Sequence, residues 1–475
     1  MGPRYRRVAV IGAGPLGISA VKALHEEKVF DTIRIFERQG RVGGIWHLDQ
    51  VPDVFPGAKG SPKQQAVPAD LPQLSPPSPE DTTVRSGIYE GLDSNVGAEA
   101  MSFTHTPFPQ INSAASTRIF GRLNPTRPFR VITRYLEDLF RAYHHLASLN
   151  TTVVKVEKND GIWNLTLRRK GHFEGSEPKE YWWQEQFDAV IVASGHYSVP
   201  FVPDVPGLDA AFKLHPTRFE HSKSFRHADN YVGKKVVVVG GNVSAADAVS
   251  DLYGIVQAPL EISQRTHNEA LDSAWNLPNV QRRPGLKSIE GTGQNLAVEY
   301  TDGSRTEGVD KIIFATGYRL SYPFLTPDPV TPNNRAAGFY QHVFKIGDPS
   351  LALVGQVRGA LSFRVYEYQA VAVARYFAGR NNVDLPSPQE QDNWEVERLK
   401  YKGNSAVFHE IKPDFAEYFN FLADLAGPAA PDSDAYALPR FDEKWVEQGF
   451  KILALKNEWW QSIQNTEKAI VPAKL

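Results

Sequence analysis

Two patterns of strand, glycine turn and helix predict an α/β protein with two Rossmann-like dinucleotide-binding domains. The first pattern runs from the apolar residues 8–11 through a glycine turn into a helix with apolar periodicity, and the second starts from the four valines 236–239. Each pattern is followed by another apolar strand, at 33–36 and at 260–263. A chain of 475 residues is long enough for two or three domains with ample cores.

The first glycine turn has the spacing that a dinucleotide requires. Gly12 allows a tight turn, Gly14 lets a pyrophosphate approach the backbone, and Gly17 lets the helix pack closely against the strand. Pro15 and Leu16 begin the helix, where the missing N–H of proline costs nothing. The unpaired N–H groups of this helix end would then face the phosphates.

An acidic residue follows the first pattern at the expected distance. The strand at 33–36 ends in Glu37, twenty residues after Gly17, and Arg38 comes next. An acid at this position is typical of a side chain that binds the two hydroxyl groups of a ribose.

A further pair of glycines follows in the segment Gly43-Gly44-Ile45-Trp46. So soon after a dinucleotide turn, this pair is expected to bring the backbone up to a flat ring system. The alternative is an ordinary turn beside a core tryptophan.

The second glycine turn departs from the first at two positions. Asn242 stands two residues after Gly240, where the second glycine would be, and Ala245, next to Ser244, stands where the third would be. Asparagine tolerates left-handed dihedral angles better than most residues, and alanine still allows close packing. We therefore interpret this segment as a second nucleotide turn.

The strand after the second turn carries polar and basic residues in place of an acid. Gln264 occupies the position that corresponds to Glu37, between Ser263 and Arg265. The loss of the acid and the gain of arginine favour a 2′-phosphate, and hence NADP over NAD. The alternative is a solvated surface arginine, because arginine is common on surfaces.

Two further buried strands end in similar glycine turns, at Gly195-His196 and at Thr316-Gly317-Tyr318. Their similarity indicates that they flank an inserted second domain. His196 fits either a functional turn or an ordinary loop.

The intervening segments predict supporting structure. Apolar spacing from 131 to 146 predicts an amphipathic helix, and residues 153–167 predict a hairpin with its turn at 159–161. Residues 51–85 are rich in proline and are interpreted as an extended loop or a disordered insertion without chemistry. The segment after residue 380 is interpreted as helices and loops whose tryptophans serve packing.

Composition and charge exclude several classes of protein. A formal net charge of −2 gives no case for nucleic acid or an anionic membrane surface. The chain contains no cysteine, which excludes disulfide frameworks, cysteine–zinc sites, iron–sulfur clusters and thiol catalysis. The 13 histidines do not cluster at metal spacing, so no metal site is expected. No apolar run reaches the roughly 18 residues that a membrane span needs.

The two ends of the chain bear on its location. No signal peptide is expected, because the first strand begins within the first ten residues. The last three residues, Ala473-Lys474-Leu475, form a small–basic–leucine tripeptide like the peroxisomal address. We therefore expect the protein in the cytoplasm or in the peroxisome.

In combination these motifs resemble those of the class B flavin monooxygenases, and more closely the flavin-containing monooxygenases of the microbial and fungal branch. The resemblance covers roughly residues 5–380. It is carried by the turn 12–17, the segment 43–46, Tyr89, Asn95, Met101 and Phe103, and the segments 194–197, 221–225, 239–247 and 314–318.

The resemblance implies a three-layer FAD domain made of residues 1–199 and 316–475, with an NADPH domain inserted at 200–315. In this family NADPH reduces FAD, and O₂ then forms a C4a-hydroperoxyflavin that oxygenates a nucleophilic nitrogen or sulfur atom of a small molecule. The partners would be this amine or sulfur substrate and O₂, and a homodimer is compatible with the resemblance. The protein needs no nucleophile of its own, because the cofactor carries the chemistry.

The resemblance also assigns roles to residues. Asn95 would be the polar side chain near the flavin that helps to hold the oxygenated intermediate and the nicotinamide. Glu37, Trp46 and the backbone of Val153 would hold FAD, whereas Ser244 and Arg265 would hold NADPH. The other residues expected to bind the cofactors are those of the turns described above, namely Gly12, Gly14, Pro15, Leu16, Gly17, Arg38, Gly44, Ile45, Gly195, His196, Gly240, Asn242, Ala245, Ser263, Thr316, Gly317 and Tyr318.

One family pattern, Phe-x-Gly-x-x-x-His-x-x-x-Phe/Tyr, bears on the substrate. His221 and Phe225 match it, whereas His215 and Thr217 replace its first two positions. Baeyer–Villiger relatives end the pattern in tryptophan, so Phe225 favours oxygenation of nitrogen or sulfur over insertion into ketones. The alternatives are a Baeyer–Villiger enzyme, an uncoupled NADPH oxidase or flavin reductase, and a nucleotide-sensing module without activity.

Overall fold

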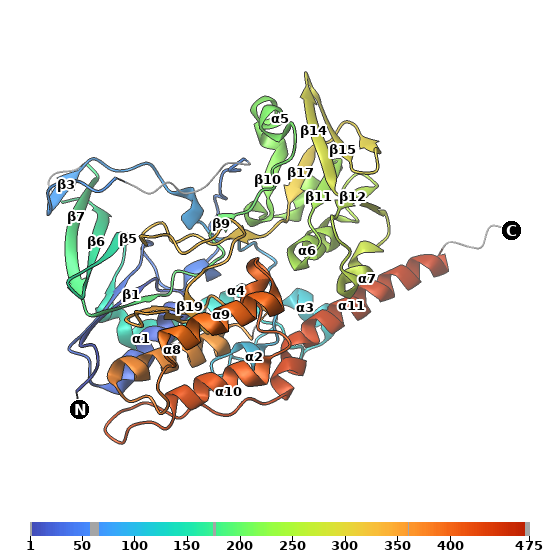
Figure 1. Cartoon of the computed structure of the whole chain (residues 1–475). Coiled ribbons are helices and arrows are strands. Elements are labelled where there is room, and N and C mark those ends of the chain that lie inside the picture. The colour runs from blue at the N-terminus through green and yellow to red at the C-terminus, as the bar shows by residue number, and fades with distance from the viewer. Residues whose placement is uncertain (1, 58–65, 174–176, 360, 471–475) are drawn as a thin grey trace.

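The computed structural model describes residues 2–57, 66–173, 177–359 and 361–470. Figure 1 shows two α/β units, one at the lower left around β1 and one at the upper right around β11. The first unit is organised around a seven-stranded sheet in which the pairs from β21 to β4 are parallel. Its strands in spatial order are β19 (Phe339–Tyr340), β20 (Phe344–Lys345), β21 (Leu351–Leu353), β8 (Ala189–Val192), β1 (Arg7–Ile11), β2 (Thr32–Phe36) and β4 (Ala147–Ser148).

An antiparallel sheet covers one face of the seven-stranded sheet. Its strands are β3 (Gln73–Ser75), β7 (Lys179–Phe187), β6 (Ile162–Gly171) and β5 (Thr151–Asn159), in that spatial order. The predicted hairpin is confirmed, because β5 and β6 meet at Asp160 and Gly161, which have φ of +49° and +81°. Positive φ at both central residues is the geometry of a tight hairpin turn. β3 belongs to the proline-rich segment, which therefore contributes an edge strand rather than only a loop.

Helices cover the other face of the seven-stranded sheet. They are α1 (Pro15–Glu27), α2 (Ala98–Met101), α3 (Ala114–Phe120), α4 (Phe129–Phe140), α8 (Phe363–Ala378), α9 (Pro388–Lys402) and α10 (Phe415–Ala426), of which α8 packs against both α1 and α10. The predicted helix over 131–146 differs from the structure at its end. The α-helix stops at Phe140, and Arg141–Leu146 continues as a 3₁₀ helix.

The central strands are buried on both faces, which accounts for their continuous apolar sequence. In β1, Val8 and Val10 pack into the core beneath the helices, whereas Ala9 and Ile11 pack against the antiparallel sheet. Because side chains alternate along a strand, one short apolar run supplies two cores. The predicted three-layer architecture is thereby confirmed.

The second unit is a five-stranded parallel sheet. Its spatial order is β10 (Phe219–His221), β17 (Lys311–Phe314), β11 (Val236–Val239), β12 (Leu260–Ser263) and β13 (Val280–Arg283). It is accompanied by α5 (Leu208–Leu214), α6 (Val243–Leu252), α7 (Asp272–Trp275) and the small antiparallel sheet β14 (Leu286–Thr292), β15 (Asn295–Tyr300) and β16 (Arg305–Thr306). The chain passes between the units along β9 (Val199–Pro200) and β18 (Tyr318–Arg319), which pair antiparallel.

The last helix, α11 (Lys444–Ile470), runs along both units, from α2 at one end to α7 at the other (Figure 1). Trp460 of this helix is 1% exposed and belongs to the core of the second unit. The predicted domain limits stay a prediction, and α11 itself contacts α2, outside the 200–315 insertion, and α7, inside it.

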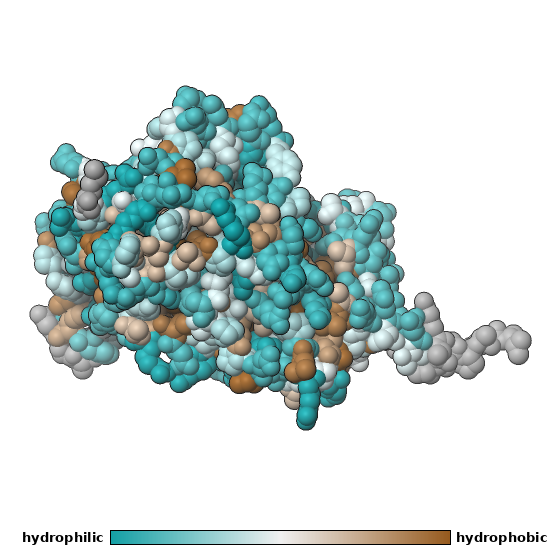
Figure 2. All heavy atoms as spheres, turned by 90° about the horizontal axis from the view of Figure 1, so that it is seen from below, coloured by the Kyte–Doolittle hydropathy of each residue, from teal (hydrophilic) through white to brown (hydrophobic). Residues whose placement is uncertain are grey.

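The surface is mainly polar on the face in Figure 2, where hydrophobic residues form small separate groups. Within the described ranges, no helix has the length and hydropathy needed to cross a bilayer. The tripeptide 473–475 lies outside the described residues.

Candidate cofactor site

The first glycine turn joins β1 to α1 with very close backbone packing. Gly12 has a φ of +105°, and a Cβ on it would lie 2.6 Å from the carbonyl oxygen of Ala193. A Cβ on Gly17 would lie 1.9 Å from the carbonyl oxygen of Gly12. The N-cap of α1 is Gly14, and no side chain caps this helix end. The first N–H groups of α1 are therefore available to a phosphate.

Glu37 is buried next to this turn. Its carboxylate accepts hydrogen bonds from the N–H groups of Ala13 and Gln39, both at 2.8 Å. Burial raises the pKa of Glu37, and the two N–H groups oppose that shift. Each carboxylate oxygen keeps a free lone pair for a ribose hydroxyl. The first residue of β5, Thr151, donates its N–H to the carbonyl oxygen of Glu37 at 2.8 Å, which places Val153 two residues further along the same strand.

The second glycine pair lies against the first turn. Gly43 donates its N–H to the carbonyl oxygen of Ala13 at 2.8 Å, and Gly44, Ile45 and Trp46 form a short 3₁₀ helix directly after it. The ring of Trp46 contacts Phe363 edge-on at 6.0 Å. The hydrogen bond between Gly43 and Ala13, which are 30 residues apart in the chain, thus brings the two glycine segments together.

Arg38, unlike the buried Glu37 that precedes it, points to the surface. Its side chain is exposed, pairs with Asp81 at 3.4 Å and donates to the hydroxyl of Ser198 at 3.1 Å. It therefore holds the end of the proline-rich segment and the crossing to the second unit.

Buried polar atoms without partners gather after β8 and β21, neighbouring parallel strands of the sheet. His196 is 4% exposed, and neither ring nitrogen has a hydrogen-bond partner among the described residues. Burial, together with the Arg358 cation, lowers the pKa of His196 to about 3, so the imidazole is neutral. The hydroxyl of Ser194 and the amide nitrogen of Gln356 are also buried without partners in the same part of the structure. Unsatisfied polar groups at the carboxyl edge beside Gly195 fit a bound cofactor.

The second glycine turn joins β11 to α6 and differs from the first in its cap. Asn242 is the N-cap of α6, and its side chain accepts a hydrogen bond from the N–H of Val243 at 2.9 Å. Its backbone is extended, with a φ of −125°, so the tolerance of asparagine for left-handed angles is not used. Asparagine instead satisfies one N–H of the helix end. Ala245 is fully buried and Ser244 is exposed in the first turn.

Arg265 lies beyond the end of β12 with its side chain free. It is exposed and makes no ion pair among the described residues, whereas Arg282 and Arg283 pair with Asp272 and Glu261. Ser263, by contrast, is buried and donates its hydroxyl to the carbonyl oxygen of Pro284 at 2.8 Å. The free guanidinium fits a phosphate ester, and Ser263 serves the local packing.

The turn after β17 forms the crossing between the units. Thr316 donates its hydroxyl to the carbonyl oxygen of Phe201, and the carbonyl oxygen of Gly317 accepts the N–H of Phe201 at 2.8 Å. The ring of Tyr318 contacts the ring of His221 at 5.4 Å. Burial lowers the pKa of His221 to about 3.

Asn95 lies where the first unit, the second unit and α11 meet. Its amide oxygen accepts a hydrogen bond from Lys456 at 2.9 Å, and its amide nitrogen lies 3.4 Å from a carboxylate oxygen of Asp247 on α6. The side chain is exposed between the two units. The structure thus brings the predicted catalytic residue to the helix that begins at the second glycine turn.

Sequence reasoning missed several residues at this site. Lys456 lies after residue 380, in the region predicted to form packing helices and loops, and no sequence motif includes it. Gln356 and Arg358 follow β21, and only their position at the carboxyl end of a buried strand could have indicated them. The Nε atom of Arg358 is buried without a partner among the residues that the structure describes.

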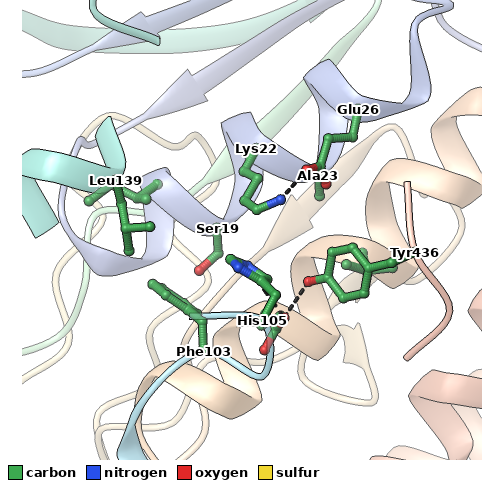
Figure 3. Close-up of a pocket in the computed structure, with 11 residues that line it drawn as sticks. Ser19, Lys22, Ala23, Glu26, Phe103, His105, Leu139 and Tyr436 are labelled. Carbon is green, nitrogen blue, oxygen red and sulfur yellow. Dashed lines mark hydrogen bonds and ion pairs between the residues drawn. The ribbon is translucent and has the colours of Figure 1, made fainter. Parts of the chain in front are cut away.

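A separate pocket lies among the helices of the first unit (Figure 3). It is lined by the later turns of α1, by Leu139 of α4, by His105 and by Tyr436. Its polar groups satisfy one another, because Lys22 pairs with Glu26 and the hydroxyl of Tyr436 donates to Glu367. We therefore assign the cofactor site to the glycine turns and not to this pocket.

Two known families match the chain. The family described as flavin-binding monooxygenase-like matches residues 268–438, and the family described as pyridine nucleotide-disulphide oxidoreductase matches residues 100–342. The disulphide chemistry in the second description does not extend to this chain, which contains no cysteine.

Individual relatives cover nearly the whole chain. The flavin-containing monooxygenase FMO GS-OX3 of Arabidopsis thaliana is 30% identical over 434 residues, which are 89% of this chain and 85% of the relative. The flavin-containing monooxygenase ustF2 of Aspergillus flavus is 26% identical and covers 94% of this chain and 96% of its own length. The structure of S-allyl-L-cysteine S-oxygenase from Allium sativum has a TM-score of 0.74 at 24% identity, covers 97% of this chain and 95% of its own, and shares the fold.

The family match and the geometry agree. The helices α1 and α6 each begin at a glycine turn. No side chain caps α1, which starts beside the buried Glu37, and only Asn242 caps α6, near which Arg265 makes no ion pair among the described residues. The chain therefore belongs to the flavin-containing monooxygenases, flavoprotein oxidoreductases whose cofactors are FAD and NADPH.

Proposed function

We propose that this protein uses NADPH and O₂ to oxygenate a nucleophilic nitrogen or sulfur atom of a small molecule. One observation carries the proposal. The chain has two dinucleotide turns but no cysteine, so electrons that pass from NADPH to FAD have no dithiol in the protein to accept them. Bound FAD, once reduced, supplies the chemistry by which O₂ is activated.

The residues of the chain bind and orient in this proposal. The free N–H groups at the start of α1 hold the pyrophosphate of FAD, Glu37 holds its ribose, and the Gly44–Trp46 segment lies against its ring system. The start of α6 holds the pyrophosphate of NADPH, and Arg265 holds its 2′-phosphate. Asn95 lies between the two units and orients the groups that react there.

The environment of Phe225 supports heteroatom oxygenation over ketone insertion. Phe225 is 6% exposed, and its ring contacts Tyr89 edge-on at 5.2 Å and stacks with Tyr231 at 5.5 Å. A tryptophan, which ends the pattern in Baeyer–Villiger relatives, would need additional volume between these two rings. The Allium sativum protein, an S-oxygenase of the same fold, acts in the same class of reaction.

The test is a coupled turnover assay with the purified holoprotein. A panel of thioethers, tertiary amines and ketones is offered with NADPH in air, and product, NADPH consumption and peroxide are measured together. The proposal expects sulfoxide or N-oxide at close to one product per NADPH. Esters from ketones would instead identify a Baeyer–Villiger enzyme, and peroxide equal to all NADPH consumed would identify an oxidase or reductase. No consumption of NADPH would indicate a nucleotide-sensing module.

We also propose that residues 1–199 and 316–475 form the FAD domain and residues 200–315 the NADPH domain. Location in the cytoplasm or the peroxisome, and a homodimer, are part of the same proposal. Fusion of the intact C-terminal tripeptide to a fluorescent protein, compared with a fusion that lacks Leu475, tests the peroxisomal location.

A further inference from the structure

Three side chains from distant segments converge between the two units. Lys456 of α11 donates hydrogen bonds to the amide oxygen of Asn95 at 2.9 Å and to a carboxylate oxygen of Asp247 at 2.7 Å. The amide nitrogen of Asn95 faces the other carboxylate oxygen of Asp247 at 3.4 Å. The side chains of Lys456 and Asp247 are 20% and 17% exposed, so water screens their ion pair only in part.

Close packing fixes α11 against the segment that carries Asn95. Gly97, two residues after Asn95, donates its N–H to the carbonyl oxygen of Gly449 at 3.1 Å. A Cβ on Gly97 would lie 2.0 Å from the carbonyl oxygen of Gln448, and a Cβ on Gly449 would lie 2.8 Å from Leu361. This close approach positions α11 so that Lys456 reaches Asn95.

A second anchor holds the same helix on the NADPH side. The indole N–H of Trp460, a side chain that is 1% exposed, donates to the hydroxyl of Ser250 on α6 at 3.0 Å. Eleven residues of helix separate this anchor from Gly449, which corresponds to about 16 Å at 1.5 Å per residue. Lys456 lies between the two anchors, so its position is set by both units.

The chemistry of the three groups determines how the amide of Asn95 is oriented. An ammonium group only donates hydrogen bonds, so Lys456 selects the amide oxygen. An ionised carboxylate only accepts them, so Asp247 selects the amide NH₂. Without Lys456, only the longer contact with Asp247, at 3.4 Å, orients the amide, so it rotates by 180° and exchanges its donor and its acceptor more readily.

We propose that Lys456 is a positioning residue that fixes the amide of Asn95, with its NH₂ group directed to α6, so that NADPH consumption stays coupled to oxygenation. The inference rests on the proposed function, in which Asn95 contacts the cofactors. Lys456 acts through Asn95 and does not itself contact the substrate.

The test compares Lys456→Met, which keeps the length of the side chain without its donors, with Lys456→Arg, which restores donors and charge. Lys451→Met is the matched control, because Lys451 is exposed on the same helix and makes no ion pair among the described residues. For each holoprotein we would measure FAD content, melting temperature, the KM for NADPH, and product and peroxide per NADPH. A panel with Asn95→Ala, alone and combined with Lys456→Met, completes the set.

The expected result is a selective loss of coupling. Lys456→Met keeps FAD and melts close to the wild type, yet product per NADPH falls about tenfold while peroxide rises, as a small displacement of an orienting group predicts. Lys456→Arg recovers most of the product. The double variant is no worse than Asn95→Ala alone, because both changes remove one interaction.

Three results would overturn the proposal. Coupling in Lys456→Met equal to that of Lys451→Met would show that Asn95 needs no such partner. If the losses of product per NADPH caused by Asn95→Ala and Lys456→Met add up in the double variant, Lys456 acts on a group other than Asn95. A fall in melting temperature and FAD content in Lys456→Met, with normal coupling in the folded fraction, would show a purely structural role.

Failure of the proposed function is recognised separately. If the wild type yields no oxygenated product, the proposed reaction fails, whatever Lys456 does. If Asn95→Ala stays fully coupled, the role of Asn95 fails, and a loss in Lys456→Met would then have another cause.

Discussion

Asp53 and Lys223 form an ion pair that is almost completely withdrawn from water, between the proline-rich segment and the crossing to the second unit. Their side chains are 4% and 1% exposed. The ammonium group of Lys223 also donates to the carbonyl oxygens of Thr83 at 3.0 Å and Ser198 at 2.7 Å. Phe55, two residues after Asp53, belongs to the core of the second unit. Its ring stacks on that of Phe314, with the ring centroids 5.6 Å apart. The segment that the sequence presents as an insertion thus ties the two units together.

Removal of Lys223 alone is expected to be more costly than removal of both partners of this pair. Burial lowers the pKa of Lys223 and raises the pKa of Asp53, which shows that each charge is costly to bury. Lys223→Met leaves the carboxylate unpaired and is expected to lower the free energy of unfolding by about 3–5 kcal/mol. In Asp53→Asn, Lys223 keeps its two carbonyl partners, so we expect a loss of about 1–3 kcal/mol.

Urea unfolding of the two single variants and the double variant gives the coupling energy between the pair. The double variant is expected to be more stable than Lys223→Met alone, and simple additivity would contradict this prediction. Lys400→Met breaks an ion pair with Glu397 whose side chains are 67% and 71% exposed, and it serves as the control with a change of at most about 0.5 kcal/mol.

Arg265 is expected to determine the preference for NADPH over NADH. Its guanidinium is exposed and free of ion pairs in the described part of the chain, so a 2′-phosphate would gain a charge-assisted hydrogen bond there. Loss of such a bond costs about 1.5–3 kcal/mol, which corresponds to an increase of about 10- to 150-fold in the KM for NADPH in Arg265→Ala. The KM for NADH stays unchanged.

Arg282→Ala is the matched control for Arg265, because Arg282 lies on the neighbouring strand and already pairs with Asp272 at 3.6 Å. Steady-state kinetics with NADPH and with NADH measure the KM values of both variants. An equal KM for NADPH in the two variants would assign the 2′-phosphate to another residue.

Gly17→Ala is expected to weaken FAD binding. The new Cβ would lie 1.9 Å from the carbonyl oxygen of Gly12, so the turn that receives the pyrophosphate has to shift. A strain of about 1–3 kcal/mol is typical of such overpacking, and it corresponds to a dissociation constant for FAD that is about 5- to 150-fold higher.

Titration of the apoprotein with FAD, followed by flavin fluorescence, measures this effect. Gly254→Ala is the control, because no heavy atom lies within 4 Å of a Cβ at that position. Equal affinities of the two variants would mean that the first turn does not bind FAD.

Stability is expected to fall on acidification because buried histidines, His196 and His221 among them, remain neutral. Burial lowers the pKa of His196 and of His221 from the ordinary value of 6.5 to about 3. Between pH 6.5 and 3 the unfolded chain therefore binds protons that the folded chain does not. Stability is full above pH 6.5, and each histidine contributes a loss of about 1.4 kcal/mol per pH unit as the pH falls through this window.

His221→Asn is expected to reduce that slope by about 1.4 kcal/mol per pH unit between pH 4 and 6. Asparagine can still accept the N–H of Lys223, which His221 accepts through Nδ1 at 3.1 Å. Urea unfolding at several pH values gives the slope, with the exposed His145→Asn as control. A slope equal to that of the wild type would place the proton uptake on other groups.

The sequence alone determined the parts of this protein that depend on local geometry. The turn at Gly12–Gly17, the acid at Glu37 and the hairpin at Asp160-Gly161 each follow from the φ angles and spacings that a short segment must adopt. The continuous apolar runs before Gly195 and Gly317 likewise predicted buried strands. The sequence, together with the family resemblance of its motifs, therefore sufficed for the fold class, the three layers and the two cofactors.

Only the tertiary structure decided which distant side chains meet. Lys456 and Asn95 are 361 residues apart in the chain, and neither periodicity nor spacing connects them. Phe55 and Asp53 belong to a segment whose composition resembles a loop, yet they pack against the second unit. A charged or aromatic side chain has many equivalent partners in the sequence, and the packing of whole helices and strands selects one of them.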